Sequence, residues 1–235
     1  MIANGGLGPI EKQYSKYFER RDAVGNEVLG SMATARWRSD SKLLGVTLSR
    51  YKFVSKMFAN FESVLEIGAA DAWYSRVVFN EVKRLTLSDF DKIWLEDFRS
   101  QDIYHESDTE YLIHNFVDSR LDRVFNGIYA LDVLEHVLPS DQSNFLSHVC
   151  SSLETNGVAI FGMPSAESQM YASAGSKAGH VNCQSGDELK KNLEKYFDNV
   201  FIFSMSDEVV HTGFTPMAHY LLALCINPRQ EGVSL

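Results

Sequence analysis

Cysteine is scarce in this 235-residue chain, and the three that occur, Cys150, Cys183 and Cys225, are far apart and show no C-x-x-C spacing. An odd number of widely separated cysteines predicts neither a disulfide framework nor a zinc site. The sequence also has no apolar run of the roughly 18 residues that a membrane-spanning helix needs. Its start, MIANGGLGPIEKQY, lacks the basic and apolar segments of a signal peptide. We therefore expect a cytoplasmic protein without a membrane partner.

Positive charge is also scarce, because 22 lysines and arginines face 31 aspartates and glutamates, for a formal net charge of −9. Nucleic-acid binding draws most of its non-specific affinity from neutralised phosphates, so this balance argues against a nucleic-acid partner. The composition, with 45% hydrophobic and 23% charged residues, is that of an ordinary globular chain without repeats or long linkers. We expect a helical cap over residues 1–60 and a larger domain over residues 61–235, with the oligomeric state open.

The spacing of apolar residues predicts helices first and then alternating strands and helices. Helical spacing occurs near Glu11–Arg21 and from Lys42 to Phe58. From residue 63 onward, amphipathic stretches alternate with the apolar runs SVLEIG, RLTLSDFD, EYLIHNFVD, GIYALDVLEHV and GVAIFGMPS. This alternation is typical of an α/β fold with a parallel sheet. The last two runs, NVFIFSMSDEVV and MAHYLLALCIN, are expected to pair as an antiparallel hairpin at one sheet edge.

The strongest local signal is the run VLEIGAADAW, in which an apolar strand ends in Glu66 and Gly68 before a helix is expected. Such a turn presents backbone N–H groups at a helix N-terminus, and its glycine lets a ligand approach the main chain. The next strand ends in Asp89, about twenty residues later, where a carboxylate can accept hydrogen bonds from both hydroxyls of a ribose. Together these features predict a nucleotide-type cofactor site; a structural turn followed by a solvated acid is the alternative.

Residues 66–72 resemble the E-x-G-x-G-x-G first motif of class I S-adenosylmethionine-dependent methyltransferases. Asp89 and Asp118 match the acidic positions after the second and third strands, and LDVLEH at residues 131–136 resembles the D-x-L-E-H block of small-molecule methyltransferases. The resemblance covers residues 59–164. It implies a Rossmann-like seven-stranded, mostly parallel sheet with an antiparallel last strand, in a three-layer sandwich with an N-terminal helical extension.

Carried over residue by residue, the resemblance implies a site for the cofactor S-adenosylmethionine. The implied residues are Glu66, Gly68, Ala69, Ala70 and Asp71 in the first turn, Asp89 and Phe90 after the second strand, Asp118 and Ser119 after the third, and Leu131 and Asp132 at the end of the fourth. Gly68 would face the methionyl part, with Glu66 beneath it, and Asp89 would hold the ribose. The residues after the third strand would address the adenine, although Asp118 has the alternative role of a helix cap.

Two positions depart from the family's pattern, since the second and third glycines of the motif are Ala70 and Ala72. A dinucleotide fold needs those glycines for approach of the pyrophosphate and for helix packing. The alanines therefore argue against a nicotinamide- or flavin-dependent oxidoreductase. The methyl donor has no pyrophosphate, so added methyl groups are easier to accommodate. Weakened cofactor binding, or a non-catalytic cofactor-binding or scaffold protein of the same fold, is the remaining alternative.

Methyl transfer from a sulfonium is an in-line displacement, in which the protein aligns the nucleophile, excludes water and handles one proton. The candidate catalytic residues are Asp132 and two loop histidines, His180 in SKAGHVN and His211 in EVVHTGF. A structural or surface role is the alternative for each histidine. Glu135 and His136 are second-rank candidates for substrate contact. No metal site is predicted.

The segment PSAESQMYASAGSKAGHVN is longer than a connection requires and is rich in small and polar residues, which is typical of a binding loop. Its side chains at Ser168, Gln169, Tyr171 and Lys177 are expected to contact a polar acceptor, and Arg50 is a candidate for the cofactor's carboxylate. The resulting hypothesis is transfer of a methyl group from S-adenosylmethionine to an O or N atom of a small polar acceptor, such as a sugar or a surface-polysaccharide precursor.

Overall fold

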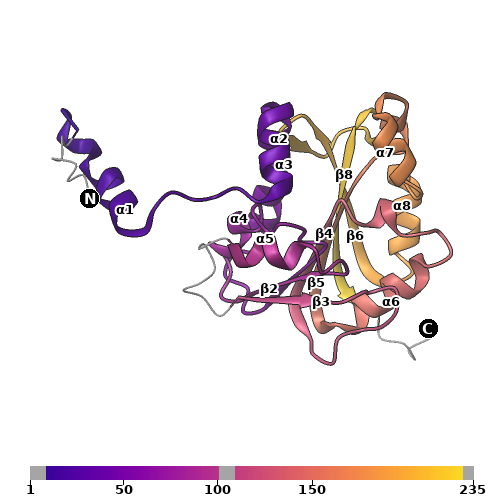
Figure 1. The fold of residues 1–235 in the computed structure, drawn as a ribbon. Helices are drawn as coiled ribbons and strands as arrows, with labels where there is room; N and C mark the ends of the chain where they lie inside the picture. The colour runs from indigo at the N-terminus through magenta and orange to yellow at the C-terminus, as the bar shows by residue number, and fades with distance from the viewer. Residues whose placement is uncertain (1–8, 101–108, 230–235) are drawn as a thin grey trace.

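The computed structural model describes residues 9–100 and 109–229 (Figure 1). The part before the sheet is helical, as the apolar spacing predicts. Its elements are η1 (Lys12–Tyr14), α1 (Ser15–Val24), α2 (Ser31–Ser39) and α3 (Ser41–Met57). The first eight residues of the expected cap and the last six of the expected larger domain lie outside the described residues. No helix in the described part of the chain combines the length and apolar character that crossing a bilayer requires.

Within the described residues, eight strands form one mixed sheet in the order β3-β2-β1-β4-β5-β8-β6-β7. Their bounds are β1 (Val64–Ile67), β2 (Leu85–Asp89), β3 (Glu110–Ile113), β4 (Phe125–Leu131), β5 (Leu153–Pro164), β6 (Phe197–Ser206), β7 (Val209–His211) and β8 (Tyr220–Pro228). Strands β1 to β5 are parallel to one another. β8 runs antiparallel to both β5 and β6. This is the expected Rossmann-like α/β arrangement.

The structure differs from the expectation at the end of the chain, where the sheet has eight strands instead of seven. The extra strand, β7, is three residues long and pairs antiparallel with β6 at the edge. The expected hairpin of β6 and β8 forms, but β8 lies inside the sheet, between β5 and β6. The reason is the continuous apolar run in β8, since Leu221 faces one hydrophobic cluster and Leu222 the other. A strand buried on both faces belongs in the interior of a sheet.

Helices cover both faces of the sheet and produce the expected three-layer sandwich (Figure 1). The remaining helical elements are α4 (Arg76–Phe79), α5 (Trp94–Ser100), η3 (Leu134–His136), α6 (Gln142–Ser151), η4 (Glu167–Tyr171), α7 (Ala174–Gly179), α8 (Gly186–Leu193) and η5 (Thr215–Met217). α6 and α8 pack on one face, and α3 and α4 pack on the other. In β1 the side chains alternate between the two clusters, Val64 toward α3 and Leu65 toward α6, as the two-residue period of a strand requires.

The N-terminal helices differ in how they relate to the sheet. α3 places Tyr51, Val54 and Phe58 in the same hydrophobic cluster as residues of β1 and β4, so it shares a core with the sheet. α1 buries none of its residues and lies apart from the sheet in Figure 1. The division of the chain at residue 60 stays a prediction.

Candidate active site

A cavity of about 780 Å³ opens at the carboxyl ends of the parallel strands. Ligands bind at this edge in open α/β sheets, because the chain connections diverge where the strand order reverses, here between β1 and β4. The turns after β1, β2, β3 and β4 form its walls together with α2 and α3. All of the implied cofactor residues except Glu66 and Ser119 line this cavity.

The turn after β1 has an unusual backbone. Gly68 has a φ of 77°, and a Cβ atom there would lie 2.3 Å from Cγ2 of Val133, so only glycine fits. Ala70 and Ala72 also have positive φ angles, 46° and 59°. Side chains other than glycine are disfavoured in this region by roughly 1–2 kcal/mol. The alanines at these two glycine positions therefore introduce backbone strain, but the turn keeps its positive-φ conformation.

The N–H groups of this turn are occupied within the protein. Those of Gly68 and Ala69 donate to the Ser88 carbonyl at 2.8 and 3.0 Å, and that of Ala70 donates to the Asp89 carboxylate at 3.1 Å. The helix expected to start here is reduced to the four residues of α4. The expectation of free N–H groups at a helix N-terminus was therefore wrong. Such a turn offers a pyrophosphate no cradle of amides, which is a second argument against a dinucleotide cofactor.

Glu66 is buried beneath the turn and takes part in a hydrogen-bond network with α3 and β4. Its carboxylate accepts a hydrogen bond from the hydroxyl of Tyr51 at 2.8 Å and another from the hydroxyl of Tyr129. Burial raises the pKa of Glu66 to about 7, against the opposing effect of these hydrogen bonds. Tyr51 itself lines the cavity. Glu66 thus lies one shell below the cavity, in agreement with the supporting role that the resemblance implies.

Asp89 lies at the end of β2 with its carboxylate in the cavity wall. One oxygen accepts a hydrogen bond from the N–H of Ala70 at 3.1 Å, and the other accepts one from the N–H of Asp91 at 2.9 Å. Burial raises the pKa of Asp89, although these hydrogen bonds oppose the shift. Each oxygen keeps a lone pair for a ligand hydroxyl. The neighbouring Phe90 ring is 73% exposed at the rim of the cavity.

Asp71 has a structural task that the sequence did not indicate. Its carboxylate accepts hydrogen bonds from the N–H of Ala33, in the first turn of α2, at 2.9 Å, and from that of Trp73 at 3.4 Å. A Cβ atom at Gly30, the residue before α2, would lie 2.4 Å from the same carboxylate. Asp71 therefore acts as a cap for α2 and fastens this helix over the cavity. Burial raises its pKa.

The two residues implied for the adenine lie in the turn after β3 and differ in position. Asp118 lines the cavity and accepts a hydrogen bond from the side-chain amide of Asn115 at 2.9 Å. Ser119 does not line it, and its carbonyl oxygen lies 2.8 Å from Nε2 of His114. The alternative role of Asp118 as a helix cap is wrong, because no helix begins between β3 and β4.

Asp132, which has a positive φ of 56°, forms the most buried ion pair of the site. Nη1 of Arg50 lies 2.9 and 2.7 Å from its two carboxylate oxygens, and the Arg50 guanidinium stacks on the Tyr220 ring, 3.7 Å from the centroid. The Arg50 side chain is 12% exposed, and that of Asp132 is 29% exposed. The expectation that Arg50 binds the cofactor's carboxylate was therefore wrong, since its guanidinium is engaged by Asp132 and does not line the cavity.

Arg36 is the guanidinium that lines the cavity, and sequence reasoning missed it. It donates to the hydroxyl of Thr47 at 3.0 Å, and its guanidinium lies 5.5 Å from the centroid of the Tyr74 ring. No motif surrounds Arg36 in the sequence. Its position follows from the capping of α2 by Asp71, a contact between residues 38 apart.

Of the two candidate histidines, only His180 lies beside the site. Its ring centroid is 5.2 Å from that of His136, which lines the cavity, and the buried Glu135 lies close to both. Burial and the neighbouring His136 lower the pKa of His180. His211 lies in β7 at the edge of the sheet, where Nδ1 accepts a hydrogen bond from the N–H of Gly213, and it does not line the cavity.

The segment after β5 is folded into η4 and α7, and its polar side chains bond within the segment. The hydroxyl of Ser168 donates to the Ser165 carbonyl at 2.8 Å, and Nζ of Lys177 donates to the Met170 carbonyl at 3.2 Å. None of the four side chains expected to contact the acceptor lines the cavity. That expectation is not met, because Ser168 and Lys177 are bonded to backbone carbonyls of their own segment, Gln169 is bonded to His180, and Tyr171 is exposed.

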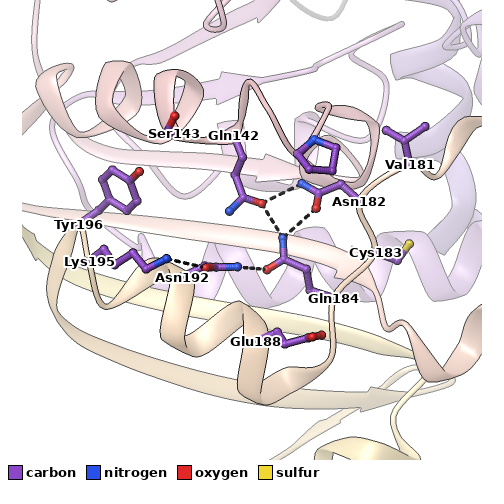
Figure 2. Close-up of a pocket in the computed structure, with 11 residues that line it drawn as sticks. Gln142, Ser143, Val181, Asn182, Cys183, Gln184, Glu188, Asn192, Lys195 and Tyr196 are labelled. Atoms are coloured by element: carbon purple, nitrogen blue, oxygen red, sulfur yellow. Dashed lines mark hydrogen bonds between the residues drawn. The ribbon is translucent and has the colours of Figure 1, made fainter.

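A second cavity, of about 610 Å³, lies beside the first and is lined by side-chain amides (Figure 2). Oε1 of Gln142 accepts hydrogen bonds from Asn182 at 2.8 Å and from Gln184 at 2.6 Å. Oε1 of Gln184 accepts one from Asn192 at 2.9 Å, and Oδ1 of Asn192 accepts one from Lys195 at 3.0 Å. This chain of amides joins α6 and α8 to the segment that follows His180.

The first cavity fits S-adenosylmethionine in size and charge. Its volume falls in the range of roughly 300–1,000 Å³ that small-molecule and cofactor sites occupy. The carboxylates that line it are Asp71, Asp89, Asp118, Asp132 and Asp141. Among the described residues that line it, Arg36 is the only one with a guanidinium. A surplus of carboxylates favours a ligand with a sulfonium cation over a pyrophosphate.

Comparison with known proteins agrees with this geometry. The sequence matches the family described as "Methyltransferase domain" over residues 37–196, more than half of the chain. The structure is similar to N-methyltransferase NodS from Bradyrhizobium japonicum WM9 in complex with S-adenosyl-L-homocysteine, with a TM-score of 0.58, 18% identity, and coverage of 82% of this chain and 92% of that chain. It is also similar to the DhpI-SAM-HEP complex, with a TM-score of 0.58, 17% identity, and coverage of 94% and 98%.

No curated protein sequence gives a significant match to the chain. At these low identities the solved structures establish the fold, and the family pattern establishes the relationship. The chain therefore belongs to the methyltransferase-domain family and is an S-adenosylmethionine-dependent methyltransferase.

Proposed function

We propose that this methyltransferase acts on a small polar acceptor and transfers the methyl group to one of its oxygen or nitrogen atoms. The supporting observation is the lining of the cavity near Asp132, where the ionisable side chains of His136 and Asp141 also line the wall. Carboxylate and imidazole groups are hydrogen-bond partners for hydroxyl and amine groups. A sugar or a surface-polysaccharide precursor is an acceptor of this chemistry.

The residues that hold the cofactor are proposed from the resemblance together with their positions. Asp89 binds the ribose, Phe90 flanks the adenine at the rim, and Asp118 addresses its amino group. The turn at Gly68 and the backbone at Leu131 border the methionyl part and the sulfonium. When bound, the cofactor supplies an electrophilic methyl group.

The groups at the acceptor end orient the acceptor. Because Asp132 is paired with Arg50 at 2.7 Å, its negative charge is fixed in place, and we propose that it positions the acceptor. The lowered pKa of His180 favours a neutral imidazole, which keeps the lone pair of one ring nitrogen for a ligand beside the cavity. His211 has no part in this proposal.

Two measurements test the proposal. Calorimetric titration with S-adenosylhomocysteine should show one site per chain, and absence of binding at millimolar ligand would contradict the cofactor part. Incubation with isotope-labelled S-adenosylmethionine should then transfer label to sugars, amino sugars or nucleotide sugars in preference to apolar phenols, transfer RNA or a protein acceptor. Labelling of the phenols or macromolecules, with none of the sugars, would contradict the acceptor class. Mass spectrometry of the product identifies the methylated atom.

A further inference from the structure

Glu135, His136 and His180 come together beside the Asp132 end of the cavity. One carboxylate oxygen of Glu135 and one ring nitrogen of each histidine lie within 4.8 Å of one another. The Glu135 side chain is only 1% exposed, and neither of its carboxylate oxygens has a hydrogen-bond partner. A buried carboxylate without a partner is strongly disfavoured unless it gains a proton or a cation. The Glu135 carboxylate therefore requires a proton or a cation at this position.

The neighbouring guanidinium of Arg50 is not the partner of this carboxylate. The guanidinium of Arg50 contacts both oxygens of Asp132, at 2.9 and 2.7 Å, and no hydrogen bond joins it to Glu135. Two carboxylates thus share the neighbourhood of a single arginine. An ionised Glu135 would carry a negative charge that this arginine does not compensate, and a bound divalent cation would offset it.

Each histidine has one ring nitrogen bonded within the protein, which leaves the other nitrogen for such a cation. Nδ1 of His136 lies 2.9 Å from the carbonyl oxygen of Gly179, and Nδ1 of His180 lies 2.9 Å from Oε1 of Gln169. Because both partners are acceptors, each Nδ1 carries the proton, and the lone pair is left on Nε2. A carbonyl or amide oxygen that holds one nitrogen and so presents the other is the usual outer shell of a metal-bound histidine.

The cluster is connected to the amide network of the second cavity, which Figure 2 shows, through the two residues that follow His180. The N–H groups of Val181 and Asn182 donate to the carbonyl oxygen of Glu135 at 2.9 and 3.0 Å. The side chain of Asn182 is in turn bound to Gln142 in α6 at 2.8 Å. His180, directly before this anchored pair, is thereby kept next to η3, which carries the other two residues of the cluster.

We propose that Glu135, His136 and His180 bind one divalent first-row transition-metal ion, such as Zn²⁺ or Co²⁺. Two imidazole nitrogens and one carboxylate oxygen match a site that keeps open positions for another ligand. Because His136 lines the cofactor cavity, a molecule in the cavity can reach those positions. On the proposed function, which this step requires, the open position binds an oxygen atom of the acceptor and holds it next to Asp132.

The test uses the full chain freed of metal by dialysis against a chelator. Titration with Co²⁺ should give one binding event per chain at micromolar concentration and the visible absorption bands of a nitrogen- and oxygen-ligated ion. Glu135→Gln and His180→Ala should each weaken Co²⁺ and Zn²⁺ binding by at least about 10-fold. His219→Gln is the matched control, because His219 accepts a hydrogen bond from the N–H of Asp207 outside the cluster, and it should bind like the parent. Mg²⁺, which prefers an all-oxygen shell, should bind more weakly.

No Co²⁺ or Zn²⁺ binding at millimolar metal, or equal binding by the parent and both variants, would overturn the proposal. Because Glu135 is buried, its variant is checked by circular dichroism; the half-buried His180 provides a variant that tests the site even if Glu135→Gln does not fold. Titration with S-adenosylhomocysteine is run on the same samples. Cofactor binding without metal binding rejects the metal site and keeps the proposed function. Metal binding without cofactor binding keeps the metal site and rejects the proposed function. Acceptor transfer that survives chelation rejects the role of the ion in acceptor binding.

Discussion

Glu66 should make the stability of this protein fall as pH rises, and replacing it by glutamine should remove that dependence. Its pKa is raised from 4.5 to about 7 by burial, so the folded state holds a proton that the unfolded chain has released between these values. Folding is therefore penalised progressively above pH 4.5, and fully above pH 7. A shift of this size corresponds to about 3 kcal/mol at about 1.4 kcal/mol per pKa unit.

Glu66→Gln is a suitable perturbation, because glutamine has nearly the same shape and carries no charge. Its oxygen can accept from one of the hydroxyls of Tyr51 and Tyr129, and its amide can donate to the other once that hydroxyl rotates. The variant should gain about 2–3 kcal/mol relative to the parent between pH 5 and pH 8. Buried Asp71 and Asp89 also have raised pKa values, but they are present in both proteins and cancel in the comparison.

Urea unfolding at pH 5, 6, 7 and 8, at constant ionic strength, measures the difference in unfolding free energy between the two proteins. Glu62→Gln serves as the control, because it makes the same substitution at a nearby glutamate that is exposed. A difference between parent and Glu66→Gln that is equal at pH 5 and pH 8 would refute the argument from burial. A changed urea dependence would point to an altered denatured state instead.

Three further predictions concern the residues around the cavity. Ala70→Gly and Ala72→Gly should each raise the unfolding free energy measured in urea by roughly 0.5–1 kcal/mol, because relief of the positive φ outweighs the added entropy of the unfolded chain. Ala69→Gly is the control and should lower the unfolding free energy, since φ is not positive there. A lower unfolding free energy in all three variants would contradict the strain. Asp89→Ala should weaken S-adenosylhomocysteine binding in calorimetry by about 2–4 kcal/mol, with Asp91→Ala little changed; an unchanged dissociation constant would remove Asp89 from the site. Asp71→Ala should destabilise the fold by about 1–2 kcal/mol and speed amide hydrogen exchange in α2. Unchanged hydrogen exchange in α2 would argue against Asp71 as its cap.

The parts of the fold that depend on local pattern could be predicted from the sequence. Strands β1 to β5 follow from apolar runs separated by amphipathic stretches, and the chain segments that meet at the cavity follow from the end of each strand. Gly68 and Asp89 lie where the motif implies, because both are held directly by strand ends. The interior position of β8 was also encoded, in the unbroken apolar run YLLALCI, but a single chain does not show which strand will lie on each side of it.

The parts that could not be predicted depend on contacts between distant residues. Arg50 and Asp132 are 82 residues apart, and the capping of α2 by Asp71 spans 38. Free N–H groups were expected in the turn after β1, but a neighbouring strand end accepts from them, and that acceptor is visible only in the folded sheet. Local patterns show which groups are available for bonding, and tertiary packing determines which of them remain available.

The same reasoning explains why the acceptor end of the cavity is the region where sequence and structure diverge most. Polar residues of the segment after β5 were expected to bind the acceptor, yet none of the four lines the cavity, and Ser168 and Lys177 are bonded to backbone carbonyls of their own segment. What this segment contributes to the site is His180, held beside His136 and the unpartnered Glu135 by amides from α6 and α8. A buried, unpaired carboxylate destabilises the fold, and binding of a ligand to it can offset this destabilisation. For this reason we expect specificity for the acceptor to depend on Glu135 and its two histidines more than on the other polar residues of the segment after β5.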